Sequence, residues 1–241
     1  MSPIARSFAD MVAYLDAKWR AAQSAGMLRS LFFALALPVG TVQACETALI
    51  LAMDVSNSVD PGEYRLQIEG LALALEDPEI MDILVRDEIA LSVMQWSGVD
   101  RQIVSLDWAS MRSALHVTGF AGRVRGLERA FVLSDTAPAE ALSEALRHFS
   151  TAPDCARKVI DVSGDGTPNA GGEVRHMRQK AERAGVTVNG LAIEGLGVAI
   201  TNFYRLQLIT RDGFVETARG HRDYARAIRK KILREISRIM G

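Results

Sequence analysis

The sequence is poor in cysteine, in aromatic residues and in excess charge of either sign. Its 241 residues include 2 cysteines and 6% aromatic residues, and the formal net charge is -1. Because phosphate binding takes a concentrated excess of lysine and arginine, this charge gives no general reason to expect nucleic acid as a partner. No internal repeat, low-complexity tract or obvious linker interrupts residues 46–241. The composition, 49% hydrophobic and 24% charged, fits an ordinary globular protein with one full-sized domain.

The sequence also lacks an apolar run of the roughly 20 residues that a transmembrane helix needs. The N-terminal candidate, residues 31–39, is much shorter, follows the basic start at residues 27–30, and is followed by a segment that ends in the small residue Ala44. This order is typical of a secretory signal peptide that is cleaved after Ala44. We therefore expect a periplasmic or secreted protein without a transmembrane anchor. Residues 1–26 do not resemble a signal peptide, so translation is expected to start at Met27, with a short cytoplasmic extension as the alternative.

Two cysteines, Cys45 and Cys155, remain after this cleavage. An even count in an exported chain favours a disulfide. The alternative makes Cys45 a lipid-attachment site at the new N-terminus. Gln43 is a poor residue for that signal, and lipidation would leave Cys155 unpaired.

From Ala48 onward, short apolar runs alternate with amphipathic stretches. The apolar runs are nearly continuous, which indicates strands that are covered on both faces. We predict an α/β fold over residues 45–241, doubly wound, with a mostly parallel central sheet and helices on both faces. Strands are predicted at 48–54, 88–95, 102–106, 158–163, 186–193 and 214–217. Helices are predicted at 61–75, 139–149, 173–184, 202–210 and 223–240.

The last of these helices has a strongly basic face opposite an apolar stripe. A basic membrane-binding helix is one interpretation, but a surface helix that docks its apolar stripe on the sheet is the commoner reason for this pattern. We therefore treat it as scaffold. Its basic residues are Arg226, Arg229, Lys230, Lys231, Arg234 and Arg238.

The first predicted strand ends in a D-x-S-x-S segment made by Asp54, Ser56 and Ser58. In open α/β sheets, ligands bind at the carboxyl ends of the strands. Alternate residues of the turn can direct one carboxylate and two hydroxyls at a common point, and such hard oxygen ligands suit Mg²⁺, Mn²⁺ or Ca²⁺ and not Zn²⁺. About one chain in twenty of this length would contain the segment by chance. The evidence for a metal site is therefore the position of the segment directly after an apolar strand.

A second strand ends in a similar way, in Gly164-Asp165-Gly166. The glycines permit a tight turn that brings the carboxylate of Asp165 toward the neighbouring strand end, although a solvated turn aspartate is the alternative. Between the two segments, Thr136 either adds one hydroxyl ligand or only precedes the helix at 139–149. Within the strand, Asp161 either supports a ligand of the site without binding the ion or is a buried carboxylate bonded to backbone amides, and we expect the second, structural role.

Together these segments resemble the metal-ion-dependent adhesion site (MIDAS) of the von Willebrand factor A (VWA) family, which combines D-x-S-x-S, a threonine on a second loop and an aspartate in a D-G turn. Thr136 matches through its spacing to Ala141-Leu142, and Asp165-Gly166 supplies the D-G turn. The resemblance covers residues 46–240, and within the family it is greatest to an uncharacterised branch of exported bacterial proteins, through segments 55–60, 160–166 and 227–236. The chain departs from the pattern at Ser134 and Asp135, where glycines usually precede the threonine.

The resemblance implies a VWA-like fold with a divalent cation, Mg²⁺ first and Mn²⁺ or Ca²⁺ as alternatives. The implied ligands are Asp54, Ser56, Ser58, Thr136 and Asp165. In adhesion domains of this family, an open position on the metal accepts a carboxylate from another protein. The resemblance therefore implies a protein partner that offers an Asp or Glu.

The resemblance also implies that the strands ending in Asp54 and Asp165 are parallel neighbours. Cys45 precedes Asp54 by nine residues and Cys155 precedes Asp165 by ten, so both cysteines should emerge together at the opposite end of these strands. Neighbouring strands lie about 4.8 Å apart, which is inside the Cα separation that a disulfide accepts. A Cys45–Cys155 disulfide is therefore expected.

The rival hypotheses are a metal-dependent hydrolase or phosphatase and a VWA scaffold whose metal is only structural. The chain has no G-x-S-x-G elbow, G-x-x-x-x-G-K-[ST] loop or G-x-G-x-x-G turn, and a phosphatase of the haloacid-dehalogenase kind would need an aspartate in place of Ser56. The histidines are scattered and are expected at the surface or at helix caps, not as catalytic bases. They are His116, His148, His176 and His221. We therefore expect a binding module and not an enzyme.

Overall fold

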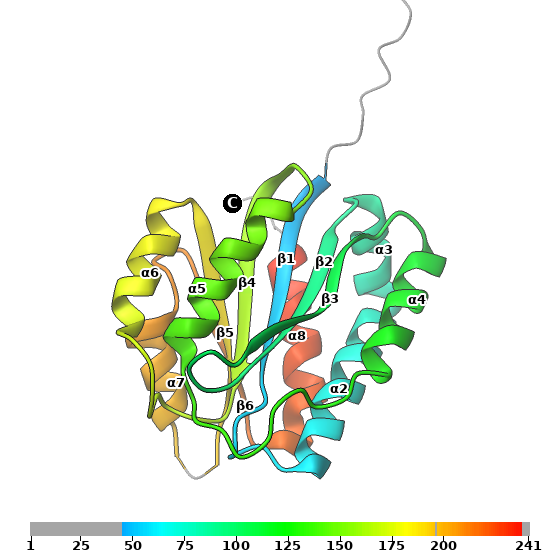
Figure 1. Cartoon of the computed structure of the whole chain (residues 1–241). Helices are drawn as coiled ribbons and strands as arrows, with labels where there is room; N and C mark the ends of the chain where they lie inside the picture. The colour runs from blue at the N-terminus through cyan, green and yellow to red at the C-terminus, as the bar shows by residue number, and fades with distance from the viewer. Residues whose placement is uncertain (1–44, 196, 238–241) are drawn as a thin grey trace, which may run out of the picture. The chain divides into compact units, whose positions relative to one another are not determined.

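The structure of this protein, a computed structural model, describes residues 45–195 and 197–237 (Figure 1). The predicted N-terminal extension, the signal peptide and its cleavage after Ala44 lie outside the described residues. Among the described residues, no helix is both long enough and apolar enough to cross a membrane.

A six-stranded sheet with the order β3-β2-β1-β4-β5-β6 forms the centre of the described part (Figure 1). All neighbouring strands pair in parallel except β2 and β3, which are antiparallel. The predicted α/β class with a mostly parallel sheet is confirmed. The strands are β1 (Cys45–Asp54), β2 (Ala90–Trp96), β3 (Gln102–Ser110), β4 (Cys155–Gly164), β5 (Val186–Ile193) and β6 (Val215–Ala218).

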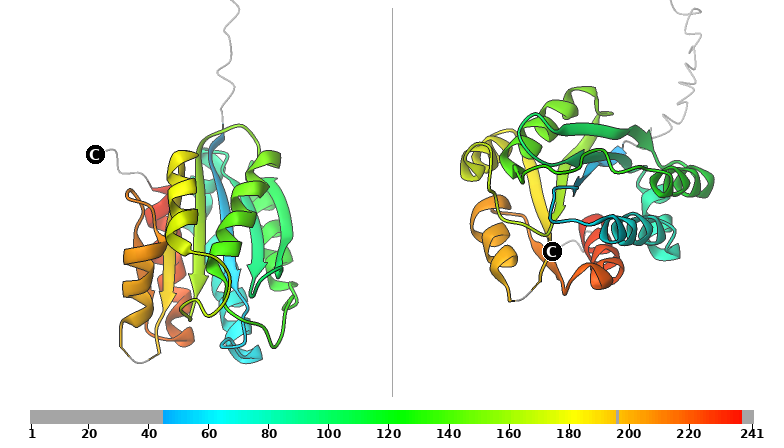
Figure 2. Two further views of the ribbon diagram at one scale, coloured as in Figure 1. Left: turned by 60° about the vertical axis from the view of Figure 1, so that its left-hand side comes forward. Right: turned by 60° about the horizontal axis from the view of Figure 1, so that its bottom comes forward.

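Helices cover both faces of the sheet, with α2, α3, α4 and α8 on one face and α5, α6 and α7 on the other (Figures 1 and 2). Their bounds are α2 (Pro61–Leu75), α3 (Pro78–Arg86), α4 (Ala114–Arg125), α5 (Pro138–His148), α6 (Val174–Arg183), α7 (Ala199–Phe203) and α8 (Tyr224–Ile236). Short turns at Phe149–Thr151 and His221–Asp223 are 3₁₀-helical, and Tyr204–Leu208 is π-helical.

Strand β1 lies in the middle of the sheet, and its side chains are buried on both faces. Leu49, Leu51 and Met53 join the core beneath α2 and α8, whereas Ile50 and Ala52 join the core beneath α5. Successive side chains of a strand point to opposite faces, so a strand with two buried faces needs an unbroken apolar run. This explains why β1 has no polar alternation.

Helices α3 and α4 were not predicted. Each has a start signal in the sequence: Asp77 accepts hydrogen bonds from the backbone N–H groups of Glu79 and Ile80, and Ser113 accepts one from His116 N–H. In α3 the first helical residue is also a proline. Such caps satisfy the free N–H groups of a first turn and commonly mark helix starts. The predicted single helix at 202–210 is also wrong, because α7 ends at Phe203 and a π-helical turn follows.

Helix α8 docks on the sheet as predicted, but Lys231 does not lie on an exposed basic face. Its side chain is 0% exposed, and its Nζ lies 2.5 Å from Asp161 Oδ1 and 3.2 Å from Glu235 Oε1. The prediction that backbone amides bind Asp161 is likewise wrong, because no backbone N–H of the described residues donates to its carboxylate. The ammonium group of Lys231 compensates the buried carboxylate instead.

The predicted disulfide is present. Cys45 and Cys155 are paired in register on the parallel strands β1 and β4, with 4.5 Å between their Cα atoms, and their sulfur atoms are bonded. The bond lies at the amino ends of both strands. The metal-site segments follow their carboxyl ends, so the disulfide and the candidate site lie at opposite edges of the sheet.

Candidate metal centre

The loop after β1 is held in shape by contacts that begin at the last residue of the strand. Ser56 N–H donates to Asp54 Oδ1 at 2.8 Å, and Val59 N–H donates to Ser56 O at 3.1 Å. The guanidinium group of Arg129 donates to the carbonyl oxygens of Val55 and Ser56. Because Arg129 binds these two carbonyls, the backbone of the loop is fixed. The side-chain oxygens of Ser56 and Ser58 are therefore held close together.

The start of α2 fixes the other end of this loop. Asp60 accepts from Glu63 N–H at 2.8 Å, and the Glu63 carboxylate accepts from Asp60 N–H at 2.9 Å, which is a complete capping box. Pro61 occupies the first helical turn, as expected from its fixed backbone angle.

Four of the five predicted ligands are brought together by a chain of side-chain contacts, and the fifth, Asp54, accepts from the backbone N–H of Ser56. Thr136 Oγ1 donates to Ser56 Oγ at 3.0 Å, and Ser56 Oγ lies 3.1 Å from Ser58 Oγ. Ser58 Oγ in turn donates to Asp165 Oδ1 at 2.5 Å. These contacts join three segments that are far apart in the sequence: the loop after β1, the segment before α5 and the loop after β4. Hydroxyl and carboxylate oxygens therefore gather at the carboxyl ends of β1 and β4.

Thr136 is held in place although serine and aspartate precede it where the family pattern has glycines. Its backbone N–H donates to Asn169 Oδ1 at 2.8 Å, and its carbonyl accepts from Asn169 N–H at 3.1 Å. Ser134 Oγ accepts from Gly98 N–H at 3.2 Å, and Asp135 O accepts from Ser97 Oγ at 3.0 Å. The two residues are thus tied to the loop after β2, and Thr136 reaches the site.

Asp54 is a buried carboxylate whose charge is incompletely compensated. Its side chain is fully buried, and Oδ2 has no hydrogen-bond partner among the described residues. Burial raises the pKa of Asp54 to about 7, although its hydrogen bonds with Ser56 act in the opposite direction. A cation beside Oδ2 would stabilise the charged form, so the residues present fit a divalent ion.

Asp165 is affected in the same direction. Burial raises the pKa of its carboxyl group, while the hydrogen bond from Ser58 lowers it. Both carboxylates are therefore partly desolvated beside three hydroxyl groups. A hard cation such as Mg²⁺ takes this kind of all-oxygen ligand set, with water completing its octahedron.

Gly164 allows the end of β4 to approach Asp54. A Cβ at this position would lie 2.8 Å from Asp54 Oδ2 and 2.8 Å from the hydroxyl oxygen of Tyr204. No side chain fits between these atoms without displacing one of them. The close approach of β4 to the carboxylate thus depends on glycine.

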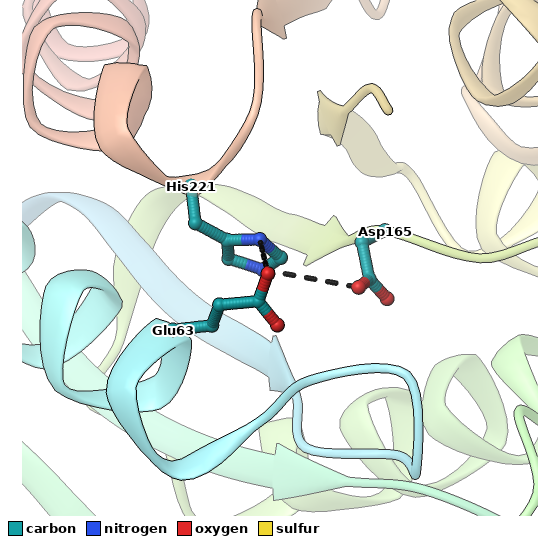
Figure 3. A group of neighbouring side chains, drawn as sticks. All are labelled: Glu63, Asp165 and His221. Carbon is teal, nitrogen blue, oxygen red and sulfur yellow. Dashed lines mark ion pairs between the residues drawn. The ribbon is translucent and has the colours of Figure 1, made fainter. Parts of the chain in front are cut away.

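Two residues beside the site were missed by the sequence prediction. His221, from the turn between β6 and α8, has Nδ1 3.1 Å from Glu63 Oε1 and Nε2 3.8 Å from Asp165 Oδ2 (Figure 3). The expectation of a surface or capping histidine is wrong for His221, whose side chain is only 8% exposed. The capping-box role of Glu63 is visible in the sequence, but nothing there indicates that His221 meets it.

Solved structures with the same fold support the class that the sheet and the site define. Proximal thread matrix protein 1 from the mussel byssus has 18% identity and a TM-score of 0.60, over 78% of this chain and 47% of that chain. A von Willebrand factor type A structure from Catenulispora acidiphila has 18% identity and a TM-score of 0.56, over 80% of this chain and 43% of that one. The manganese-loaded TRAP protein of Plasmodium vivax has 16% identity and a TM-score of 0.52, over 80% and 73%.

These likenesses show the fold alone, which is VWA-like. The chain covers less than half the length of the first two proteins. The mussel protein has also been solved with zinc in its MIDAS motif. None of the curated protein sequences matches this chain. The chain belongs to the family described as "Protein of unknown function (DUF1194)", which matches residues 44–240.

Proposed function

We propose that this chain is an exported binding module that holds a divalent cation, Mg²⁺ in the first place, and binds a protein partner through an Asp or Glu of that partner. The cation would be held by Asp54, Ser56, Ser58, Thr136 and Asp165. One observation carries the proposal. The side chains of Thr136, Ser56, Ser58 and Asp165 form one contact chain. Asp54 accepts from Ser56 N–H through Oδ1, and its buried Oδ2 has no hydrogen-bond partner among the described residues.

The ligand chemistry supports a role in binding. Hydroxyl ligands carry no charge, so an ion that is held by three hydroxyls and at most two carboxylates keeps a strong attraction for one more anionic oxygen. A carboxylate from another protein supplies such an oxygen. Asp and Glu are mostly exposed on protein surfaces, so a partner can present one.

The disulfide supports export. Disulfides persist in oxidising compartments such as the periplasm and the extracellular space, and they are rare in the cytosol. Cys45 and Cys155 are bonded here, and they are the only cysteines in the chain. Export through the signal peptide that the N-terminal sequence predicts would place the domain where this bond forms.

A metal-dependent peptide-binding experiment tests the partner chemistry. Immobilised peptides with a single Asp or Glu are compared with matched peptides that carry Asn or Gln, in Mg²⁺ and then in EDTA. Wild-type protein should be retained only on the acidic peptides and only in Mg²⁺, and Thr136→Ala should weaken this retention because it removes one ligand. Equal retention on the amide peptides, or retention that survives EDTA, would contradict the proposal.

The two rival hypotheses give different results in the same preparation. A purely structural metal raises the midpoint of thermal unfolding without any carboxylate-dependent retention, because any ligand that binds only the folded state stabilises it. A metal-dependent phosphatase releases nitrophenol from p-nitrophenyl phosphate in Mg²⁺, and Asp54→Asn would abolish that release.

A further inference from the structure

His221 lies between two carboxylates that come from different elements. Its ring belongs to the 3₁₀ turn before α8, Glu63 belongs to the first turn of α2, and Asp165 follows β4 (Figure 3). The nearest oxygen and nitrogen atoms of the three side chains all lie within 4.8 Å of one another. A histidine in such a position contacts one carboxylate through each ring nitrogen.

The two ring nitrogens have different surroundings. Nδ1 lies 3.1 Å from Glu63 Oε1, and this carboxylate favours a proton on Nδ1. Nε2 is buried, has no hydrogen-bond partner among the described residues, and faces Asp165 Oδ2 at 3.8 Å. In the neutral ring with its proton on Nδ1, the lone pair of Nε2 points toward a carboxylate oxygen. Two lone pairs that face each other need a cation or a donor between them.

We propose that Nε2 of His221 and Oδ2 of Asp165 bind a second divalent ion, a transition metal such as Zn²⁺, next to the all-oxygen site. Glu63 is the positioning residue, because its carboxylate holds Nδ1–H and orients the ring. Histidines that ligate metals almost always donate the other ring N–H to a carboxylate, a carbonyl or water in this manner. Imidazole nitrogen selects Zn²⁺ and similar ions over Mg²⁺.

Asp165 can serve both ions because its two oxygens face different neighbours. Oδ1 accepts from Ser58, on the side of the all-oxygen site, whereas Oδ2 faces His221. A carboxylate that bridges two metal ions through separate oxygens is common in sites whose ions are about 3.5 to 4 Å apart. The second ion therefore needs no rearrangement of Ser58.

The separation of the two ligand atoms suits a metal with short bonds. Zinc takes nitrogen at about 2.0 to 2.1 Å and carboxylate oxygen at about 2.0 to 2.2 Å, so two ligands of a tetrahedral ion lie roughly 3.4 Å apart. The observed 3.8 Å has to close by only a few tenths of an ångström. Water completes the shell, since only two protein atoms bind directly.

The ring of His221 also borders open space. A cavity of about 400 Å³ is lined by Glu63 and His221 together with Asp60, Arg219 and Arg222. The arginines oppose a cation, and the carboxylates of Glu63 and Asp165 offset them. The cavity borders the ring of His221, whereas Nε2 itself is buried.

Zinc calorimetry on the full, oxidised chain in excess Mg²⁺ tests the proposal. Wild type should bind one Zn²⁺ with Mg²⁺ still in its own site, and His221→Ala should weaken Zn²⁺ binding at least about tenfold, with Mg²⁺ affinity unchanged. Glu63→Gln keeps the capping box and should weaken Zn²⁺ binding by a smaller factor. His176→Ala, at an exposed histidine on α6, is the matched control and should titrate as wild type.

Nitrogen-detected NMR of the imidazole rings supplies a second readout that a merely structural histidine would not change. The Nε2 resonance of His221 should shift when one equivalent of Zn²⁺ is added, while that of His176 stays in place. The second site would be refuted if His221→Ala binds Zn²⁺ as tightly as wild type does. It would also be refuted if the Nε2 resonance of His221 does not shift when Zn²⁺ is added.

The inference goes beyond the proposed function and shares only Asp165 with it. Asp54→Asn should abolish Mg²⁺ binding and leave Zn²⁺ binding through His221 intact. If wild type fails to bind Mg²⁺ while His221 still binds Zn²⁺, the proposed function fails and the second site stands. If Mg²⁺ binds and His221→Ala leaves Zn²⁺ binding unchanged, the second site fails and the proposed function stands.

Discussion

Asp54 combines full burial with a negative charge, so its energetics depend on what stands beside it. An ordinary Asp has a pKa near 3.8, and burial raises the pKa of Asp54 to about 7. The unfolded chain therefore releases its proton at a lower pH than the folded chain does. Between these two pKa values the folded state binds more protons, so the contribution of Asp54 to stability falls as the pH rises toward 7.

In metal-free protein, Asp54→Asn should therefore be more stable than wild type at pH 8, by up to a few kcal/mol. The difference should shrink toward zero as the pH falls below about 3, where Asp54 is protonated in both states. Mg²⁺ should reverse the order, because only wild type keeps the carboxylate that binds it. Denaturant unfolding at several pH values, with EDTA or Mg²⁺, measures this, and a pH-independent difference would refute the assignment.

Gly164 gives a second test at the scale of one residue. In Gly164→Ala the new Cβ would press on Asp54 Oδ2 and the Tyr204 hydroxyl, each 2.8 Å away. We expect a loss of about 1 to 3 kcal/mol in stability together with weaker Mg²⁺ binding. Gly119→Ala in α4 meets nothing within 4 Å and should be neutral or stabilising. Unfolding curves of the two variants measure these changes in stability. If Gly164→Ala is as stable as wild type, β4 does not approach Asp54 as closely as described.

The sequence predicts some of these residues much better than others. The D-x-S-x-S segment and the D-G turn each follow an apolar strand, so local pattern places Asp54, Ser56 and Asp165 at one edge of the sheet. His221 follows a short edge strand and has no local signal. Its meeting with Glu63 and Asp165 depends on how the turn before α8 lies against α2, and this is a tertiary contact.

At the scale of elements, α8 is held to the sheet by buried charges as well as by its apolar stripe. Lys231 pairs with Asp161 on β4, and Glu235 accepts a hydrogen bond from the Asn189 side chain on β5 at 2.6 Å. The helical pattern places Lys231 on the basic face, and lysine is rarely fully buried without a partner. The partner, Asp161, lies 70 positions earlier in the sequence, so the pattern of α8 alone does not reveal it.

Lys231→Met should destabilise the protein by about 3 to 5 kcal/mol, because it leaves two buried carboxylates without their cation. The neighbouring Lys230 pairs with Glu216 but is 64% exposed, so Lys230→Met should cost at most about 1 kcal/mol. Chemical denaturation of both variants makes the comparison. Equal effects at the two positions would show that the buried cluster does not hold α8.

The ends of some helices can be predicted from nearby residues, whereas others depend on tertiary contacts. Helix α2 begins and ends at the predicted residues, 61 and 75, and a proline and a capping box mark its start. Helices α3 and α4 were missed although both have N-caps and α3 also has a clear apolar periodicity; only α4 is weakly periodic. The π-helical turn at Tyr204–Leu208 begins with a residue that packs closely on the sheet, since a Cβ at Gly190 would lie 2.5 Å from the Tyr204 ring.

At the scale of the whole molecule, the disulfide and the metal centre act at opposite ends of the same two strands. Cys45 and Cys155 are separated by 110 positions, so their bond restricts a long loop of the unfolded chain. Because the register of β1 and β4 is fixed by many backbone pairs, we expect that breaking the bond leaves the distant site intact. The resemblance to the VWA family predicted this pairing, and the register explains it.

The double variant Cys45→Ala/Cys155→Ala should lose up to about 5 kcal/mol of stability through the greater entropy of its unfolded chain. Its Mg²⁺ affinity should stay within about twofold of wild type, since both cysteines lie at the far ends of the strands. Thermal unfolding and Mg²⁺ titration of the folded variant check both points. A large loss of affinity in a folded variant would mean that the strand register depends on the bond.

The central claim is that this domain holds a divalent cation at Asp54, Ser56, Ser58, Thr136 and Asp165. Calorimetric titration of Mg²⁺ into wild type, Asp54→Asn and Asp107→Asn tests it most directly, because Asp107 is an aspartate whose side chain is 80% exposed on β3. The account predicts one Mg²⁺ bound by wild type and by Asp107→Asn, and none by a folded Asp54→Asn protein. Equal heats for all three proteins would contradict it.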